Sequence, residues 1–310
     1  MKNLTRKDFI KLTASAAMAV PIAIVYGRDS MFGSTSVAQL YSSHPGLQLY
    51  TLRESFAKDP EGTLKKVAEI GYKDLEFYDP SKLFMAGQVK DLGMNIVSTH
   101  FLPGYITGNW DKTFIKNPPT EKLEDIIELC AKNGVKNLGV GILFPADHTS
   151  FDDYKRFAEK ANKAGEKTKA AGVQLYYHNH SFEFEPTQST TPLEAMLSVL
   201  DKDLVKLELD VFWTTVSGNN PTEWIKKLKG RIKFLHLKDL KKDTPKDYTT
   251  FQVKPEAFVA LGDGVVNFKS VLEAAHAADV PFTFVEQDHS AIDPFESITK
   301  SFNYLKKLGQ

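Results

Sequence analysis

Cysteine is almost absent from this sequence of 310 residues, in which Cys130 is the single residue of its type. One cysteine excludes an intramolecular disulfide. The neighbours of Cys130 in IIELCAKNG are apolar at helical spacing, which predicts a helix whose thiol side faces the core. We therefore expect Cys130 to be a structural residue.

Net charge is lacking as well, because 39 Lys and Arg residues balance 39 Asp and Glu residues. No long basic run supplies a local positive field, so we expect no nucleic-acid partner. With 42% hydrophobic and 25% charged residues, the composition is that of an ordinary globular protein. The length allows one α/β barrel or two smaller domains.

The N-terminal apolar stretch is too short for a membrane span of ~20 residues. It follows a basic start in MKNLTRKDFIKLTASAAMAVPIAIVYG and precedes STSVAQ, where Ser36 and Ala38 fit a small-x-small cleavage pattern. This predicts an export signal and short linker over residues 1–41, a periplasmic location and no stable membrane insertion after cleavage. TRKDFIKL resembles the twin-arginine motif with Lys7 in place of the second arginine, so the export route stays open. An amphipathic first helix is the alternative.

From residue 42 to residue 310 we expect a single domain in which β-rich runs and amphipathic helical segments alternate. Eight runs have strand character: GLQLYTL, DLEFY, MNIVSTH, KNLGVGI, VQLYYHNH, VKLELDVFW, IKFLHLKD and PFTFVEQ. Eight strand–helix units in one chain of this length predict a closed (β/α)8 TIM barrel. An open doubly wound sheet is less favoured, because no glycine-rich turn follows the first strand. The long polar insert over residues 237–268 is expected to lie over the barrel mouth.

Ligand-type side chains stand at the carboxyl ends of these predicted strands, where barrels place their active sites. In chain order they are Glu76, His100, His178, His180, Asp210, His236 and Glu286. A mixed set of imidazoles and carboxylates suits a divalent ion such as Mn²⁺, Mg²⁺, Co²⁺ or Zn²⁺. The sequence therefore predicts a metal centre at the barrel mouth.

Several motifs resemble the xylose-isomerase-like sugar isomerase/epimerase superfamily, which includes tagatose epimerases, inosose dehydratases and AP-endonuclease barrels. The resemblance covers roughly residues 46–308 and rests on HNH at 178–180, LDVFW at 209–213, HLKD at 236–239, GDGVVNF at 262–268 and VEQD at 285–288. It implies the fold above and the metal ligands His178, Asp210, His236 and Glu286. His178 stands where many relatives carry a glutamate. Glu208, one step deeper on the same strand face as Asp210, is an alternative ligand or a supporting residue.

Other side chains near these strand ends are candidates for proton transfer and substrate contact. We expect His100, His180, Glu183 and Lys238 to be catalytic, and the sequence does not rank them. Glu76 and Trp213 are expected to contact substrate, Trp213 by stacking on a sugar ring, with plain packing as its alternative. Trp110 and Phe101 are expected to line the same mouth.

A divalent ion beside a keto sugar would acidify the neighbouring carbon, so the chemistry implied is epimerisation, isomerisation or β-elimination. The predicted export favours an unphosphorylated carbohydrate as the small-molecule substrate, and a homo-oligomer stays open. Two alternatives remain: a non-catalytic sugar-binding barrel, and an AP-endonuclease-like phosphodiesterase. Neutral charge and only eight histidines argue against the second.

Overall fold

The computed structural model describes residues 45–110, 115–187 and 190–309, and these residues form the predicted TIM barrel. Its eight parallel strands close in the order β1-β10-β7-β6-β5-β4-β3-β2. The barrel strands are β1 (Gly46–Gln48), β2 (Asp74–Phe77), β3 (Asn95–Phe101), β4 (Asn137–Val140), β5 (Gln174–His178), β6 (Val205–Asp210), β7 (Ile232–Leu237) and β10 (Phe282–Val285). Seven of the eight runs expected from the sequence contain one strand each, and β3 extends one residue beyond its run, to Phe101. The export signal predicted over residues 1–41 lies outside the described residues.

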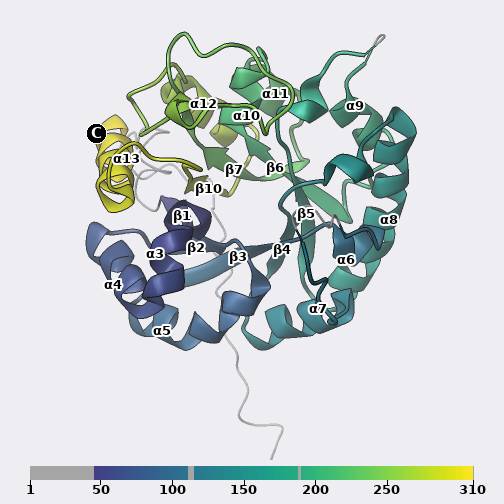
Figure 1. Ribbon diagram of the computed structural model, residues 1–310, viewed down its shortest axis with the longest axis horizontal. Helices are drawn as coiled ribbons and strands as arrows, with labels where there is room; N and C mark the ends of the chain where they lie inside the picture. Colours follow the sequence, from purple (N-terminus) through teal and green to yellow (C-terminus); the bar gives the residue numbers. More distant parts are fainter. Residues whose placement is uncertain (1–44, 111–114, 188–189, 310) are drawn as a thin grey trace, which may run out of the picture. The chain divides into compact units, whose positions relative to one another are not determined.

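Helices form a ring around the outside of the barrel (Figure 1). Their apolar faces pack on the strands, as the amphipathic spacing in the sequence predicts. The α-helices are α3 (Arg53–Lys58), α4 (Pro60–Ile70), α5 (Ala86–Asp91), α6 (Gly104–Thr107), α7 (Leu123–Lys132), α8 (Phe151–Ala170), α9 (Pro192–Leu197), α10 (Val211–Val216), α11 (Pro221–Lys227), α12 (Phe268–Ala277) and α13 (Pro294–Leu308). Short 3-10 helices are η1 (Leu49–Leu52), η2 (Pro80–Met85), η3 (Pro145–Asp147), η4 (Phe182–Phe184) and η5 (Pro255–Ala257).

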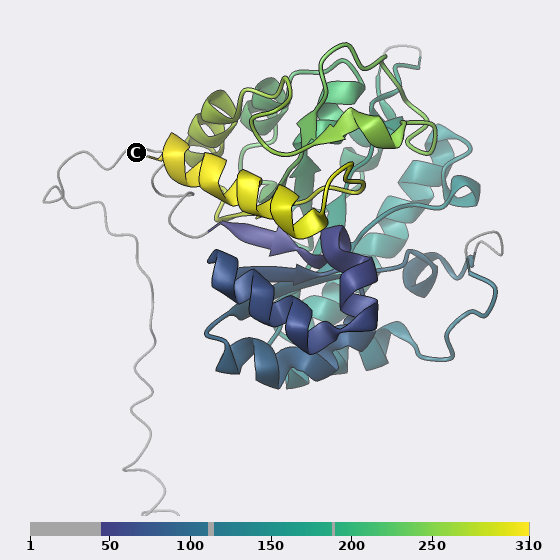
Figure 2. The same ribbon diagram turned by 60° about the vertical axis from the view of Figure 1, so that its left-hand side comes forward.

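The last helix closes the ring on the first ones. Figure 2 shows α13 beside α3 and α4, and the Tyr72 hydroxyl donates to the carbonyl of Ile298 at 2.9 Å. Cys130 is buried on α7, as the sequence predicts. None of the described helices combines the length and the apolar character that a membrane crossing requires.

Aromatic rings fill the lower part of the barrel lumen. Tyr176, Phe234 and Phe284 form a buried cluster, each two residues before a polar strand end on the same face of its strand. Gly139 makes room for this layer, because a Cβ there would lie 2.2 Å from the Tyr176 ring. These rings therefore fill the lower part of the lumen, and the polar strand-end residues lie above them, at the open end of the barrel.

The insert after β7 forms a small antiparallel pair, β8 (Asp239–Leu240) with β9 (Phe258–Val259), joined by a long segment over the barrel mouth. The Asp239 carboxylate holds the insert together by accepting hydrogen bonds from the backbone amides of Gly262, Gly264 and Val266. A Cβ at Gly264 would lie 2.3 Å from Oδ1 of Asp239, so only glycine allows this approach. The HLKD and GDGVVNF motifs are thus joined by these hydrogen bonds.

Candidate active site

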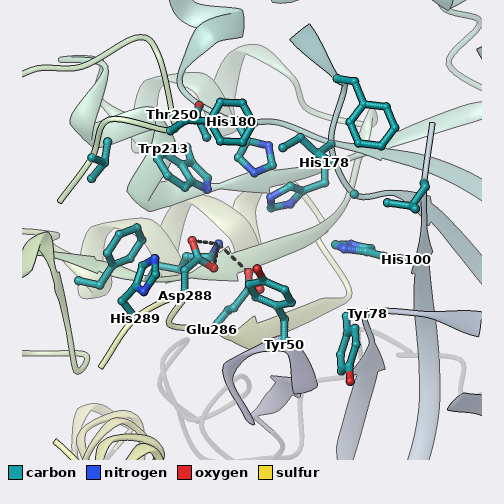
Figure 3. Close-up of a pocket in the computed structure, with 18 of the residues that line it drawn as sticks. Tyr50, Tyr78, His100, His178, His180, Trp213, Thr250, Glu286, Asp288 and His289 are labelled. Carbon is teal, nitrogen blue, oxygen red and sulfur yellow. Dashed lines mark hydrogen bonds and ion pairs between the residues drawn. The ribbon is translucent and has the colours of Figure 1, made fainter. Parts of the chain in front are cut away.

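A cavity of about 520 Å³ opens at the carboxyl ends of the strands (Figure 3). Its charged and imidazole lining includes residues expected at the site, namely His100, His178, His180, Lys238 and Glu286. Other polar lining residues are Asp288, His289, Tyr50, Tyr78 and Thr250. Because neighbouring parallel strands end at the same rim, residues more than 180 positions apart in the sequence share this one space.

Three of the predicted metal ligands lie together on the neighbouring strands β6, β7 and β10. Nδ1 of His236 is 2.7 Å from Oε2 of Glu286 and 3.7 Å from Oδ2 of Asp210. All three side chains are buried, and one ligand atom from each lies within 4.8 Å of the others. Nδ1 of His236 lies close to the Glu286 carboxylate, and Oδ2 of Asp210 lies close to the Lys238 ammonium. Neither atom makes a hydrogen bond of suitable geometry with the described residues. Buried atoms of this kind fit a metal ion, which would satisfy both.

Lys238 already places a cation among these carboxylates. Its Nζ lies 3.2 Å from Oδ2 of Asp210, 2.7 Å from Oε2 of Glu286 and 3.1 Å from Oδ1 of Asp288. A buried ammonium is costly unless it is paired, and here three carboxylates surround it. Asp210 and Glu286 therefore already face one cation, the ammonium of Lys238, and their charge suits a second cation held beside it.

A second layer of carboxylates lies beneath the histidines. Glu76 places Oε1 2.7 Å from Nε2 of His236 and 3.1 Å from Nε2 of His100, while Oε2 of Glu208 is 2.7 Å from the same atom of His100. Gln48 and Tyr176 also donate to Glu76, so its two oxygens are fully used. Burial alone would raise the pKa of Glu76, but His100 and His236 lower it well below its usual range. Glu76 is therefore an ionised carboxylate that lies beneath His236 and contacts its Nε2 atom.

His178, the fourth ligand implied by the resemblance, lies with the deeper group. Its Nδ1 is 3.2 Å from Oε2 of Glu208 and has no hydrogen-bond partner among the described residues. Ligand atoms of His178, His100, Glu208 and His236 lie within 4.8 Å of one another, whereas the cluster of Asp210, His236 and Glu286 does not include it. The structure therefore brings together three of the four implied ligands, with His178 beside them on β5.

The remaining predicted residues divide into those at the cavity and those away from it. His100, His180, Lys238, Trp213 and Phe101 line the cavity, but three other residues do not: Glu76, Glu183 and Trp110. Glu183 is fully buried and accepts hydrogen bonds from the Tyr177 hydroxyl and the His180 amide, so it shapes the loop after β5. Glu76 faces the lumen floor, and Trp110 packs edge-on against Tyr105 outside this cavity. These three residues, expected to contact substrate (Glu76), to be catalytic (Glu183) and to line the mouth (Trp110), thus lie outside the cavity lining, and Glu76 and Glu183 contact His100 and His180, which line it.

Protonation differs between the two sides of the cavity. Burial lowers the pKa of His178 and of His180 well below the usual value, and nearby cationic groups lower it further. His100 is also buried, but the charges of Glu76 and Glu208 raise its pKa to about 9. Nδ1 of His180 and Nε1 of Trp213 are buried without a hydrogen-bond partner among the described residues, and both residues line the cavity. They are available to a ligand.

Three residues that the sequence reasoning missed complete the site: Asp288, Tyr50 and Gln48. Asp288 follows Glu286 by two positions and pairs with Lys238, a position that the alternating strand pattern could have indicated. Tyr50 lines the cavity from η1, directly after a strand of only three residues. No motif in the sequence around it indicates a site residue. Gln48 supports Glu76 from the neighbouring strand, a contact set by the register of β1 and β2, in which Gln48 is paired with Glu76.

Known proteins share this fold and parts of this sequence. Inosose dehydratases from Lacticaseibacillus casei and Clostridium perfringens (strain 13 / Type A) are 29% identical over 167 residues and 30% identical over 165 residues, covering 51% and 50% of this chain. The chain spans about half the length of these curated relatives, 55% of each. A solved sugar phosphate isomerase/epimerase from Parabacteroides distasonis is 26% identical with a TM-score of 0.69, covering 85% of this chain and 96% of that one.

The zinc-bound IolI protein shares the fold at 17% identity and a TM-score of 0.65, over 86% of this chain and 97% of that one. The profile described as xylose isomerase-like TIM barrel matches residues 64–308. That match covers most of the described barrel and extends over the strand ends that carry Asp210, His236 and Glu286. The chain belongs to the xylose isomerase-like TIM barrel family.

Proposed function

We propose that this protein is a divalent-metal-dependent enzyme that acts on a keto sugar or a related carbohydrate by removing a proton next to a carbonyl. The observation that carries the proposal is the buried cluster of Asp210, His236 and Glu286 at the end of a carbohydrate-sized cavity. The relatives support the substrate class, because they include inosose dehydratases and a sugar phosphate isomerase/epimerase.

Asp210, Glu286 and Nδ1 of His236 would hold the metal ion, with His178 at the adjoining strand end. Mixed carboxylate and imidazole donors suit Mn²⁺, Mg²⁺, Co²⁺ or Zn²⁺, and a relative with the same fold binds zinc. When bound, such an ion acts as a Lewis acid that polarises a carbonyl oxygen and acidifies the carbon beside it. Glu76 holds Nε2 of His236, which directs Nδ1 toward the carboxylate pair.

The side chains around this cluster supply the remaining functions. His178 and His180 lie on one side of the cavity, while Glu286 and Asp288 lie on the other (Figure 3). The unpartnered Nδ1 of buried His180 can accept a substrate proton, and the ammonium of Lys238 can donate one. Trp213 contributes a flat ring and a free indole N–H for a sugar.

Reprotonation on the opposite face would give epimerisation, reprotonation on the neighbouring carbon isomerisation, and loss of a β substituent elimination. We propose an unphosphorylated substrate. The backbone amides of Gly262 and Gly264 in LGDG, a candidate anion loop, donate to Asp239 and are not free for a phosphate. A periplasmic location, which we also propose from residues 1–41, agrees with this choice.

Metal content of the purified protein tests the proposal directly. We expect one equivalent of Mn, Co, Zn or Mg by elemental analysis after loading and desalting, and its loss in Asp210→Ala. The control is Asp203→Ala, which removes an exposed carboxylate paired only with Lys202. Equal metal content in Asp210→Ala and Asp203→Ala would contradict the proposed centre.

Proton abstraction is tested separately from metal binding. Keto sugars and inososes are incubated with the loaded enzyme in deuterated water, and we expect solvent deuterium at the carbon beside the carbonyl. Exchange that depends on the metal and disappears in Asp210→Ala supports the reaction class, whatever the final product. Metal binding without exchange on any keto sugar would favour the sugar-binding barrel instead.

A further inference from the structure

The cavity has two chemically different parts. Its floor carries the charged and imidazole groups at the strand ends, as described above. Above the floor, Tyr50, Tyr78, Thr250 and His289 are the polar lining residues, and the rest of the lining is apolar. The apolar part of the wall comes from the end of β3, the loop after β4, and the insert up to β9. The apolar wall residues are Phe101, Ile142, Phe144, Phe251, Val253 and Phe258.

The cavity has the volume of a small-molecule binding site. About 520 Å³ lies within the range of roughly 300–1,000 Å³ that holds drug-sized ligands. A free monosaccharide carries hydroxyl groups around its whole edge, and each one buried without a partner costs roughly 1–3 kcal/mol in principle. The six apolar wall side chains offer no polar atom to satisfy them, whereas Tyr50, Tyr78, Thr250 and His289 do. The apolar part of the wall therefore suits a part of the ligand that has no hydroxyl groups.

Phe251 is the exposed member of this wall. Its side chain belongs to a residue that is 51% exposed, while Phe101 and Phe258 are buried. A large apolar residue exposed on the wall of a cavity gains free energy when a ligand covers it. The ring is thus placed for contact with a bound molecule.

Hydrogen bonds hold the backbone just before Phe251 in an unusual conformation. The preceding residue, Thr250, has a φ of 62°, a left-handed conformation that is rare for a β-branched side chain. It is held by its hydroxyl, which lies 2.9 Å from that of Ser181 and accepts from the Ser181 amide at 3.3 Å. Asp247 accepts from the Thr250 amide at 3.0 Å on the other side. The insert is therefore tied to the loop after β5, which also carries His180.

We propose that these walls form a subsite for the apolar substituent of a glycoside, so that the substrate is a sugar ring at the floor joined to an apolar, preferably aromatic, group at the mouth. The inference rests on the carbohydrate substrate proposed above and narrows it from a free sugar to a glycoside. Trp213 lies between the two parts, since it lines the cavity and packs against both His180 and Phe258. Its ring can contact the sugar and its substituent at once.

Binding measurements on the purified full-length protein test this without turnover. The probes are methyl glucoside and phenyl glucoside, each in both anomeric forms, measured by titration calorimetry. For one anomer we expect the phenyl glucoside to bind about tenfold more tightly than the methyl glucoside, a difference of about 1.4 kcal/mol. Phe251→Ala should reduce this preference about fivefold, and Phe251→Leu, which keeps apolar volume, should reduce it less.

Phe84→Ala is the matched control, because Phe84 is 70% exposed in η2 and does not line the cavity. We expect it to keep the full preference for the phenyl glucoside. Equal affinity for both glucosides, or an unchanged preference in Phe251→Ala, would overturn the inference, as would no binding of either. Failure of the metal and deuterium experiments would instead reject the proposed reaction, so the two outcomes are distinguishable.

Discussion

Nε2 of His236 lies 2.7 Å from Oε1 of Glu76, while the other ring nitrogen of His236 faces Glu286 at 2.7 Å. A carboxylate can only accept, so both ring nitrogens carry hydrogen when no metal ion is bound; burial lowers the pKa of His236, but the charges of Glu208 and Glu286 raise it well above its usual value. A metal ion held at Nδ1 would replace the hydrogen there, while Nε2 still donates to Glu76. Glu76 does not line the cavity, and its hydrogen bond fixes the orientation of buried His236 beside Glu286, which does line it.

Replacing Glu76 by Gln should therefore weaken metal binding. We expect the metal affinity to fall roughly 10–100-fold, because an amide can present a donor to Nε2 and release the imidazole from its orientation. A competitive titration with a metal-sensitive chelator measures this. Asp74→Asn is the control on the same strand, since Asp74 accepts a hydrogen bond only from Asn95 in the exposed lower part. An affinity of Glu76→Gln equal to that of Asp74→Asn would refute the orienting role.

Lys238→Met should separate metal binding from turnover. Removing the ammonium leaves Asp210 and Glu286 without their cation, so we expect tighter metal binding and a thermal stability that depends more strongly on added metal. Turnover should fall by roughly 10²-fold or more if Lys238 transfers a proton. Thermal melts with and without metal, together with the deuterium exchange rate, provide the two readouts.

The exposed residue Lys241 gives the control for that experiment. Lys241→Met removes the same charge in the neighbouring insert, outside the buried cluster. It should leave the metal dependence of the thermal stability and the deuterium exchange rate at their wild-type values. If Lys238→Met also exchanges at the normal rate, Lys238 has no part in proton transfer.

Glu183 gives the protein a stability that decreases toward alkaline pH. Burial raises the pKa of Glu183 to about 8, although Tyr177 and the His180 amide stabilise its charge. In the unfolded chain a glutamate has a pKa of about 4.3. The folded state therefore binds the extra proton between these values, so this contribution to stability is full below about 4.3 and is lost as pH rises through about 8.

Glu183→Gln removes this titration and keeps the shape. The Gln oxygen can accept from the His180 amide, and its amide group can donate to the Tyr177 hydroxyl. Between pH 5 and pH 8 we expect the free energy of unfolding of the unchanged protein to fall by roughly 2–4 kcal/mol relative to the variant. Urea unfolding at both pH values in the presence of chelator measures it, and parallel pH profiles would disprove the prediction.

The buried carboxylate of Asp239 is expected to be costly to remove. Asp239→Ala leaves the amides of Gly262, Gly264 and Val266 without their acceptor, which should lower the free energy of unfolding by about 3 kcal/mol. Asp263→Ala in the same loop breaks only an exposed ion pair with Lys300 and should cost under about 1 kcal/mol. Urea denaturation of the two variants, side by side, tests the difference.

The sequence by itself was enough to predict the barrel, because each strand run and helical segment has its own periodicity that needs no distant partner. It also placed Asp210, His236 and Glu286 at a common rim, since parallel strands of a closed barrel end together. The family resemblance agreed with both predictions and with the match over residues 64–308.

Tertiary structure decided which polar residues reach the cavity and which support it. Glu76, Glu208 and Glu286 all lie near the ends of strands in the sequence, yet the barrel puts Glu76 and Glu208 beneath the histidines and Glu286 at the cavity. The tie between Ser181 and Thr250, 69 positions apart, likewise places Phe251 over the site. Such contacts depend on strand register, barrel closure and loop packing. These are set by interactions along the whole chain, so no single segment of the sequence predicts them.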